Sequence, residues 1–233
     1  MAPPRKPHRL TLGIDEAGRG PSVGPMVMAA VVVDSRTAAA LTRKGLADSK
    51  TYGAGEDAHA LRSALAVEIR ARATFVALIE VEATEIDARV LRGELNVLER
   101  ELAVRLIEQA PTADRIIADG KRMFAPLTAR FAGFESHDNG ESVHAAVAAA
   151  SVIAKVRRDE RFAEIRARYE AELDQGPITG GGYANAATRK WVRAYVERHR
   201  RLPEEARRSW PHPYVHDLIG ETRPPGLQTE LFG

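Results

Sequence analysis

Residues 9 to 34 read RLTLGIDEAGRGPSVGPMVMAAVVVD, two apolar segments joined by a loop rich in glycine and proline. Residues 9–15 and 25–34 have the apolar and β-branched character of strands, and the second segment is apolar enough to be buried on both faces. Because the loop between them is tight, we expect the two strands to pair antiparallel.

Strand and helix patterns follow one another along the rest of the chain. Further strands are predicted at residues 74–83, 114–120 and 130–136. Helices are predicted at residues 57–73, 91–111, 142–173 and 185–201. The third helix opens with HAAVAAASVIAK, small residues that let a helix backbone lie close to a sheet. This order predicts an α/β fold, a mixed central β-sheet flanked by helices, with a small C-terminal helical appendage.

The composition narrows the class of protein. The chain has 233 residues, 44% hydrophobic and 28% charged, which suits a globular domain with a sizeable core, alone or with an appendage. There is no cysteine, which excludes a disulfide scaffold and a cysteine zinc site. The N-terminal residues lack the apolar run of a signal peptide, and the longest apolar run, Met26–Val33, falls short of the ~20 residues that span a bilayer. We therefore expect a cytoplasmic protein without a membrane partner.

Basic residues are concentrated near the C-terminus. The net charge is only +2, so the global charge says little about a nucleic-acid partner. Between Asn185 and Trp210, however, the chain has eight basic residues and three acids: Arg189, Lys190, Arg193, Arg198, Arg200, Arg201, Arg207 and Arg208 against Glu197, Glu204 and Glu205. With aromatic residues among them, this segment suits a phosphate backbone, or else it is a solvated, arginine-rich helix. His212 and His216 are expected at the surface, because Pro213 between them argues against a helical metal pair.

Two adjacent acids, Asp15 and Glu16, follow the first strand. Neighbouring side chains of a strand point to opposite faces, so both acids serve one site only if the strand ends there. We expect residues 17–20 to supply the turn. The glycines of this loop match neither a dinucleotide fingerprint nor a Walker loop, because residue 23 is valine and no G-K-[ST] follows. They instead allow main-chain groups to approach a ligand closely.

Three more acids stand at the ends of predicted elements. Asp119 closes the strand at 114–120, and Asp138 and Glu141 precede or open the alanine-rich helix. Each could simply cap a helix or turn at the surface. Buried together, however, such acids are costly unless they share a cation, and oxygen ligands without cysteine select magnesium or manganese over zinc.

These motifs resemble the ribonuclease HII (type 2 ribonuclease H) family. The resemblance rests on GIDEAGRGPSVGPMVMAAVVV, followed in order by DSK, EID with LN, IIADG, AVAAASVIAKVRRDERF and GGGY. It extends from about Leu10 to Trp210, and the C-terminal part is more similar to the archaeal and eukaryotic-type enzymes. It implies an RNase H-like fold and an endonuclease that cuts the RNA of RNA–DNA hybrids, including single ribonucleotides embedded in duplex DNA.

The resemblance also implies the metal ligands. Asp15, Glu16 and Asp119 match the catalytic carboxylates, and Glu141 stands where the family usually has aspartate. A glutamate there is similar to the related ribonuclease HIII group, and Asp138 is the competing candidate for the fourth ligand. The implied cofactors are two Mg²⁺ or Mn²⁺ ions.

Substrate contacts follow from the same resemblance. Backbone groups of Gly18, Arg19 and Gly20 would read the ribose 2′-hydroxyl, which distinguishes RNA from DNA, and Tyr183 would stack under the sugar. Lys50 of the DSK motif would contact a phosphate.

The C-terminal sequence GLQTELFG carries a Q-x-x-L-F pattern. It is similar to the peptide by which bacterial replication proteins dock on the sliding clamp, with Gln228, Leu231 and Phe232 at the matching positions. The alternative is a tail that packs on its own domain.

The expected organisation is a catalytic domain at 9–174, a helical substrate-binding lobe at 175–220 and a flexible tail at 221–233, in a monomer. Two alternatives remain open for the function. One is a ribonuclease HIII-like enzyme that prefers long hybrids, and the other is a non-catalytic module that binds RNA–DNA hybrids.

Overall fold

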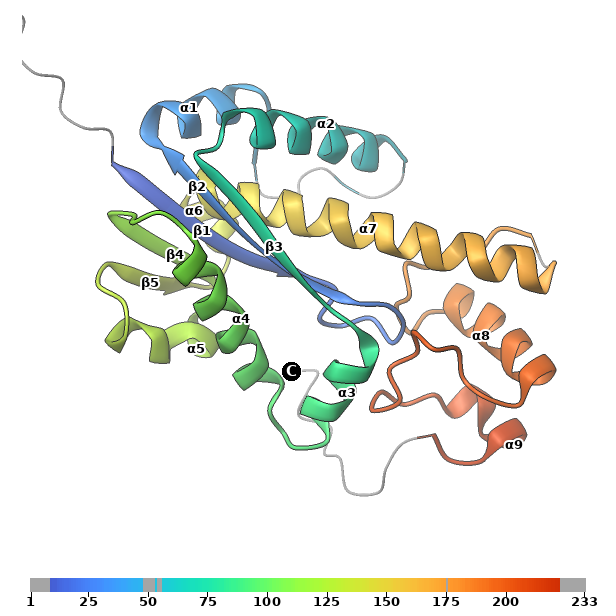
Figure 1. Ribbon diagram of the computed structural model, residues 1–233. Coiled ribbons are helices and arrows are strands. Elements are labelled where there is room, and N and C mark those ends of the chain that lie inside the picture. Colours follow the sequence, from blue (N-terminus) through green and yellow to red (C-terminus); the bar gives the residue numbers. More distant parts are fainter. Residues whose placement is uncertain (1–8, 48–52, 54–55, 175, 223–233) are drawn as a thin grey trace, which may run out of the picture. The chain divides into compact units, whose positions relative to one another are not determined.

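The computed structural model describes residues 9–47, 53, 56–174 and 176–222 (Figure 1). Its strands are β1 (Leu10–Ala17), β2 (Met26–Asp34), β3 (Phe75–Val81), β4 (Arg115–Asp119) and β5 (Phe134–His137). They form one five-stranded sheet in the order β3-β2-β1-β4-β5. Strand β1 pairs antiparallel with β2 and parallel with β4, and β4 pairs parallel with β5. The predicted mixed sheet with an antiparallel first pair is confirmed.

Helices occupy most of the remaining described chain. The longer ones are α1 (Ser35–Arg43), α2 (Glu56–Arg72), α3 (Ala83–Val90), α4 (Leu95–Gln109), α7 (Ala145–Leu173) and α8 (Ala186–His199). The short ones are α5 (Lys121–Phe124), η2 (Ala125–Ala129), α6 (Gly140–Val143), η3 (Pro213–Val215) and α9 (His216–Ile219). The predicted helices correspond to α2, α4, α7 and α8, and the sheet flanked by helices is confirmed.

Several element boundaries differ from the prediction, for local reasons. Helix α1 was not expected; its N-cap is Asp34, whose Oδ1 accepts a hydrogen bond of 2.6 Å from the Thr37 amide. The helix predicted at 91–111 begins only at Leu95, after a turn in which Gly93 has a φ of 68°. The strand predicted from residue 130 begins at Phe134, because Gly133, with a φ of 73°, ends a turn there.

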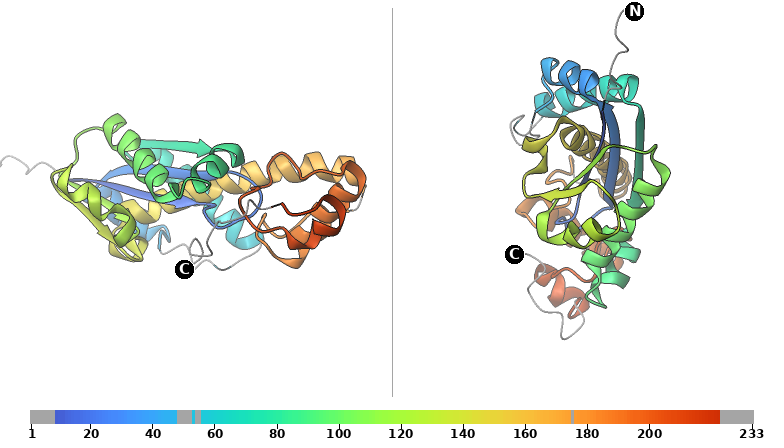
Figure 2. Two further views of the ribbon diagram at one scale, coloured as in Figure 1. Left: turned by 90° about the horizontal axis from the view of Figure 1, so that it is seen from below. Right: turned by 90° about the vertical axis from the view of Figure 1, so that its left-hand side faces the viewer.

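The described residues form two compact units, each with its own core. The first unit comprises the described residues up to Ala17 together with Val27–Ile79 and Glu99–Val156. The second unit comprises Gly18–Met26, Glu80–Leu98 and the described residues from Arg157 onward. The first core lies between the sheet and helices α1, α2 and α7, whereas α4 lies on the other face of the sheet (Figures 1 and 2). The second core gathers aromatic and aliphatic residues of α7 and α8.

The start of α7 lies directly against β1. Strand β2 is buried along its whole length up to Asp34, as its apolar sequence predicted. On β1, Gly13 faces the helix so closely that a Cβ atom there would lie 2.1 Å from the carbonyl carbon of Ala146. The small residues that open α7 therefore allow backbone-to-backbone packing, as their composition indicated.

None of the helices in the described part of the chain has the length and hydropathy needed to cross a membrane.

Replacing Gly13 by alanine is expected to destabilise the protein by about 3 kcal/mol, because the new methyl group meets main-chain atoms that cannot move aside without shifting α7. Urea unfolding measures the effect. Gly45→Ala is the matched control. No atom of the described residues lies within 4 Å of its Cβ position, so its φ of 96° is what opposes alanine, and about 1 kcal/mol is expected. Equal costs for the two variants would contradict the steric explanation.

Candidate active site

Three acidic side chains from separate segments meet at one edge of the first unit. Asp15 lies on β1, the central strand, where it is opposite Ala29 and only 4% exposed. Asp119 ends the neighbouring parallel strand β4, and Glu141 lies in α6 with an exposure of 8%. One carboxylate oxygen of each residue lies within 4.8 Å of those of the other two. The sheet register and the short helix after β5 thus create an acidic cluster, called here the acid triad.

Hydrogen bonds fix the orientation of the triad. Asp15 Oδ1 accepts from the Glu16 amide at 2.9 Å, and Asp119 Oδ1 accepts from the Gly140 amide at 2.8 Å. A Cβ at Gly140 would fit only tightly, 3.3 Å from the Asp119 Cα. The carboxylates therefore stand in place before any ligand arrives.

A lysine and a serine on α7 face the triad. Lys155 Nζ donates to Glu141 Oε1 at 3.2 Å and to Ser151 Oγ at 2.6 Å. Residues four apart lie on the same side of a helix, so Ser151 and Lys155 form a pair. Sequence reasoning missed both as site residues; the only signal was their place in the motif ASVIAK, which looks like helix packing.

Burial and charge act together on Asp15. Desolvation, together with the nearby charges of Glu141 and Asp119, raises the pKa of its carboxyl group to about 7, although the Ser151 hydroxyl and the Lys155 ammonium oppose the shift. Among the residues that the structure describes, Asp15 Oδ2 is buried and accepts no hydrogen bond. A buried oxygen of this kind fits a cation, and three carboxylates are hard ligands of the type that Mg²⁺ and Mn²⁺ prefer. The residues present thus fit a divalent metal.

The other two predicted acids lie outside the triad. The strand does not end at the acid pair, because β1 continues to Ala17 and Glu16 still pairs with Met28; the chain bends only afterwards, within the predicted turn at residues 17–20. Successive strand residues point to opposite faces, which separates the half-buried Glu16 side chain from that of Asp15. Asp138 is exposed and accepts a hydrogen bond from the Lys121 amide at 3.0 Å, where α5 begins. Of the two candidates for the fourth ligand, the structure brings Glu141 to Asp15 and Asp119.

The predicted substrate contacts belong to the second unit. Residues 18–24, between β1 and β2, are called here the glycine loop. A Cβ on Gly20 would lie 3.9 Å from the Tyr183 ring, so this ring, which is 54% exposed, stands beside the glycine loop. Gly182 has a φ of 77°, and a Cβ there would lie 2.3 Å from the Val23 carbonyl oxygen. The Arg19 side chain donates to Asn96 Oδ1 at 2.8 Å. Lys50 and the tail residues Gln228, Leu231 and Phe232 lie outside the described residues.

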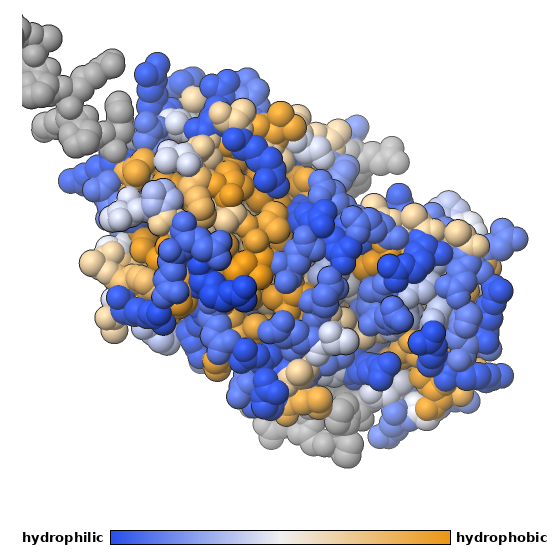
Figure 3. Space-filling view, viewed as in Figure 1, coloured by the Kyte–Doolittle hydropathy of each residue, from blue (hydrophilic) through white to orange (hydrophobic). Residues whose placement is uncertain are grey.

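The basic segment is less uniform than its sequence suggested. Arg207 is fully buried, and Arg193 forms ion pairs with Asp217 at 2.7 Å and Glu197 at 3.1 Å. The other six basic residues are exposed, and the region of α8 is mostly hydrophilic in Figure 3. The surface placement of His212 was wrong: it is fully buried, and its ring contacts the Arg207 carbonyl oxygen at 2.9 Å.

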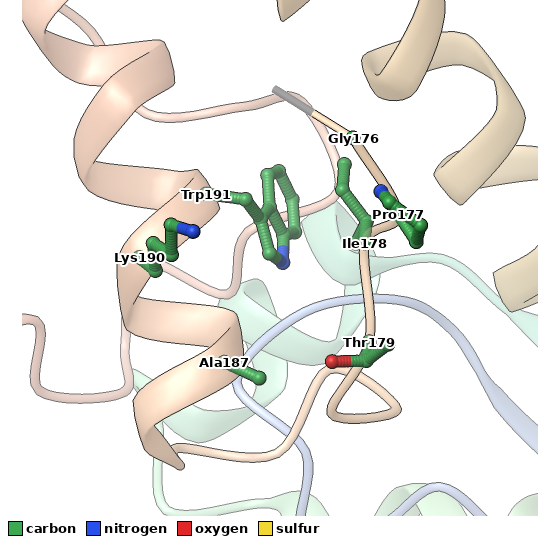
Figure 4. A pocket seen from close by; sticks show the side chains of 7 residues that line it. All are labelled: Gly176, Pro177, Ile178, Thr179, Ala187, Lys190 and Trp191. Atoms are coloured by element: carbon green, nitrogen blue, oxygen red, sulfur yellow. The ribbon is translucent and has the colours of Figure 1, made fainter. Parts of the chain in front are cut away.

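A cavity of about 130 Å³ lies in the second unit (Figure 4). Its lining consists of Gly176, Pro177, Ile178, Thr179, Ala187, Lys190 and Trp191. It contains no carboxylate, so it offers no ligand set for a divalent ion.

A mixed sheet with a buried carboxylate on its central strand and two more acids beside it is typical of metal-dependent nucleases with the RNase H-like fold. A family model described as Ribonuclease HII matches residues 12–212. The chain belongs to the ribonuclease HII family.

Relatives and solved structures agree with this assignment. Ribonuclease HII of Pyrococcus furiosus is 34% identical over 208 residues, which cover 85% of this chain and 87% of the relative. The crystal structure of ribonuclease H2 from Pyrococcus horikoshii OT3 matches with a TM-score of 0.75 and 25% identity, over 90% of this chain and 97% of that one. The ribonuclease HII of Archaeoglobus fulgidus, solved in a complex with PCNA, matches with a TM-score of 0.72 and 23% identity, over 86% and 95%.

Family membership fixes the general activity. The chain is a ribonuclease H, an endonuclease that acts on RNA–DNA hybrids and depends on divalent metal ions. The alternative of a non-catalytic hybrid-binding module is therefore dropped. The RNase H-like fold inferred from the motifs is confirmed.

The raised pKa of Asp15 predicts how the stability of the protein without metal changes with pH. A carboxyl group with a pKa of about 7 in the folded protein and an ordinary value of 3.8 when unfolded binds its proton more tightly in the folded state. The stability that Asp15 contributes to the folded protein is therefore lost as the pH rises from about 4 to about 7. Without metal, the unfolding free energy of Asp15→Asn minus that of the wild type should grow by roughly 2–3 kcal/mol from pH 5 to pH 8.

Urea unfolding in a chelating buffer measures this difference. Saturating Mg²⁺ serves as the control and should remove the trend, because a cation stabilises the ionised carboxylate. A difference that stays constant across the pH range in the chelating buffer would show that Asp15 titrates normally.

Proposed function

We propose that this enzyme cuts on the 5′ side of ribonucleotides, both in RNA–DNA hybrids and where single ribonucleotides are embedded in duplex DNA. The products are 3′-hydroxyl and 5′-phosphate ends, and the enzyme acts as a monomer. The acid triad carries the proposal. Three carboxylates close together and shielded from water repel one another and also a phosphodiester, so they serve hydrolysis only with bound cations.

The proposed ligands are Asp15, Glu16, Asp119 and Glu141, which hold two Mg²⁺ or Mn²⁺ ions. Bound at such carboxylates, the ions supply an activated water for attack on phosphorus and stabilise the leaving oxygen. Asp15 would be one of the ligands that hold the ions, because it lies on the central strand and has a buried oxygen without a hydrogen bond in the described structure. Glu16 is proposed as the fourth ligand from the family motif, although its side chain lies outside the acid triad.

Lys155 keeps the triad compact by offsetting part of its charge. Its ammonium contacts Glu141, and its charge lowers the pKa of Asp15 against the effect of burial. Ser151 holds the ammonium in place through its hydroxyl. In the proposed function, these two residues orient Glu141 for ion binding.

Recognition of the ribonucleotide is assigned to the second unit. Main-chain groups of Gly18, Arg19 and Gly20 read the 2′-hydroxyl, and the exposed ring of Tyr183 stacks under the sugar. Lys50 is the proposed phosphate contact of the DSK motif. We propose residues 175–220 as the substrate-binding lobe, in which the six exposed basic residues lie along the phosphate backbone.

A duplex with one ribonucleotide tests the proposed cleavage. The wild type should cut it only with Mg²⁺ or Mn²⁺, and end-group analysis should find a 3′-hydroxyl upstream of the ribonucleotide. Asp15→Asn should lower the cleavage rate by at least about 10³-fold while duplex affinity stays within about threefold, because it removes ion binding more than phosphate contacts. Turnover like the wild type in this variant would exclude Asp15 as a metal ligand.

The ribonuclease HIII-like alternative is motivated by Glu141, and the same assay separates it. An enzyme of that type prefers a long hybrid and cuts poorly at a lone ribonucleotide. The GRG sequence and the exposed Tyr183 favour the first reading, because both provide contacts to one ribose.

The C-terminal tail has a proposed partner, the bacterial sliding clamp. Gln228, Leu231 and Phe232 match the Q-x-x-L-F pattern of clamp-docking peptides. A structure of the Archaeoglobus fulgidus relative in complex with PCNA supports the proposal.

Deletion of residues 227–233 should abolish binding to the clamp in a surface plasmon resonance measurement and leave cleavage of the free duplex unchanged. Leu231→Ala with Phe232→Ala should reproduce the loss, because these side chains supply the apolar contacts. Unchanged clamp affinity after the deletion would remove this partner.

A further inference from the structure

Arg207, in the second unit, is fully buried. It nevertheless belongs to the segment expected to contact phosphates. Burial and the nearby Arg158 lower the pKa of its guanidinium to about 9, so the group still carries its charge at neutral pH. A buried charge is costly unless it is fully hydrogen-bonded. The partners of Arg207 therefore indicate what it does.

The guanidinium of Arg207 donates to the main chain of the glycine loop. Nη1 donates to the Arg19 carbonyl at 2.7 Å, and Nε and Nη2 donate to the Gly24 carbonyl at 3.1 and 2.9 Å. Nη2 also donates to the Gly18 carbonyl. The main-chain amide of Arg207 donates to the Ser22 carbonyl at 2.9 Å. One residue thus holds four carbonyl groups of the loop.

Trp210 completes this arrangement. Its Nε1 donates to the Gly20 carbonyl at 3.2 Å, and its ring centre lies 5.0 Å from the Arg207 guanidinium carbon. The short segment from Arg207 to Trp210 therefore turns the carbonyls of the glycine loop toward itself.

The orientation of the carbonyls fixes the orientation of the amides. In a planar trans peptide, the carbonyl of one residue and the N–H of the next point in opposite directions. The Gly18 and Arg19 carbonyls face Arg207, so the amides of Arg19 and Gly20 point away from it. The following residue, Pro21, has no amide hydrogen to orient. The arrangement presents donors on the outer side of the loop, which suits the oxygens of a ribose or phosphate.

We propose that Arg207 is a positioning residue that sets the backbone amides of the glycine loop for recognition of the ribose 2′-hydroxyl. The inference rests on the proposed reading of that hydroxyl by Gly18, Arg19 and Gly20. Lysine cannot replace arginine here, because the planar guanidinium reaches three carbonyls at once, whereas an ammonium concentrates its donors at one point.

The test measures preference for a ribonucleotide separately from general affinity. Binding is compared for a duplex with one ribonucleotide and the same duplex in all-DNA form, by fluorescence anisotropy with Mg²⁺, in an Asp119→Asn background that blocks cleavage. Adding Arg207→Lys should reduce the preference for the ribonucleotide about tenfold, through loss of hydrogen bonds from a charged group. Arg208→Met, which removes an exposed charge next to it, should weaken both duplexes by the same factor.

Each result has a definite consequence. If Arg207→Lys keeps the preference for the ribonucleotide, the positioning role is overturned and the proposed function stands. If Arg207→Lys weakens binding of both duplexes equally, the role of Arg207 is merely structural, and the positioning role is again overturned. If the Asp119→Asn protein itself binds both duplexes equally well, the proposed reading of the 2′-hydroxyl is wrong instead.

A second variant covers the case in which Arg207→Lys does not fold. Trp210→Phe keeps an aromatic ring at this position and removes the Nε1–H group that donates to the Gly20 carbonyl. It should reduce the preference about threefold. An unchanged preference in this variant also overturns the proposal.

Discussion

Mutual repulsion among buried carboxylates is the constraint on which the active site depends. Asp15 is held on the central strand, where it pairs with Ala29 of β2, and the preceding residues of β1 pair with β4. Asp119 and Glu141 are brought to it by the parallel pairing of β4 and by the short helix after β5. The folded chain offsets this repulsion only in part, through Lys155 and through a raised pKa at Asp15. A bound cation would offset the remaining repulsion among the carboxylates.

In the second unit, the buried charge of Arg207 is stabilised in a different way. Arg207 is paired with main-chain carbonyls rather than with an acid. Carbonyl dipoles can satisfy a guanidinium only if several converge on it, and the glycine loop provides that geometry. The same contacts give the loop a defined shape. Buried charges therefore organise both the carboxylates and the loop that the proposed function assigns to the substrate.

The sequence predicted the sheet, its mixed character and four of the six longer helices of the described chain, because apolar periodicity is a local property. It missed α1, since Asp34 looked like the end of a strand rather than an N-cap, and it also missed α3. It named Asp15, Asp119 and Glu141 but missed Lys155, because nothing local distinguishes a lysine that faces an acid from a solvated one. It counted Arg207 among phosphate-binding residues, because composition cannot show burial.

The amino-acid sequence by itself determined the family, the strand pair, the alanine-rich helix and the set of acids from which the triad is drawn. Motif order and side-chain periodicity are local properties of the sequence, so they do not depend on contacts between distant residues. Only the tertiary structure decided that Glu141 rather than Asp138 joins the triad, that Glu16 lies outside it, and that Arg207 turns inward. Each of these depends on strand register and burial, which arise from contacts between residues far apart in the sequence.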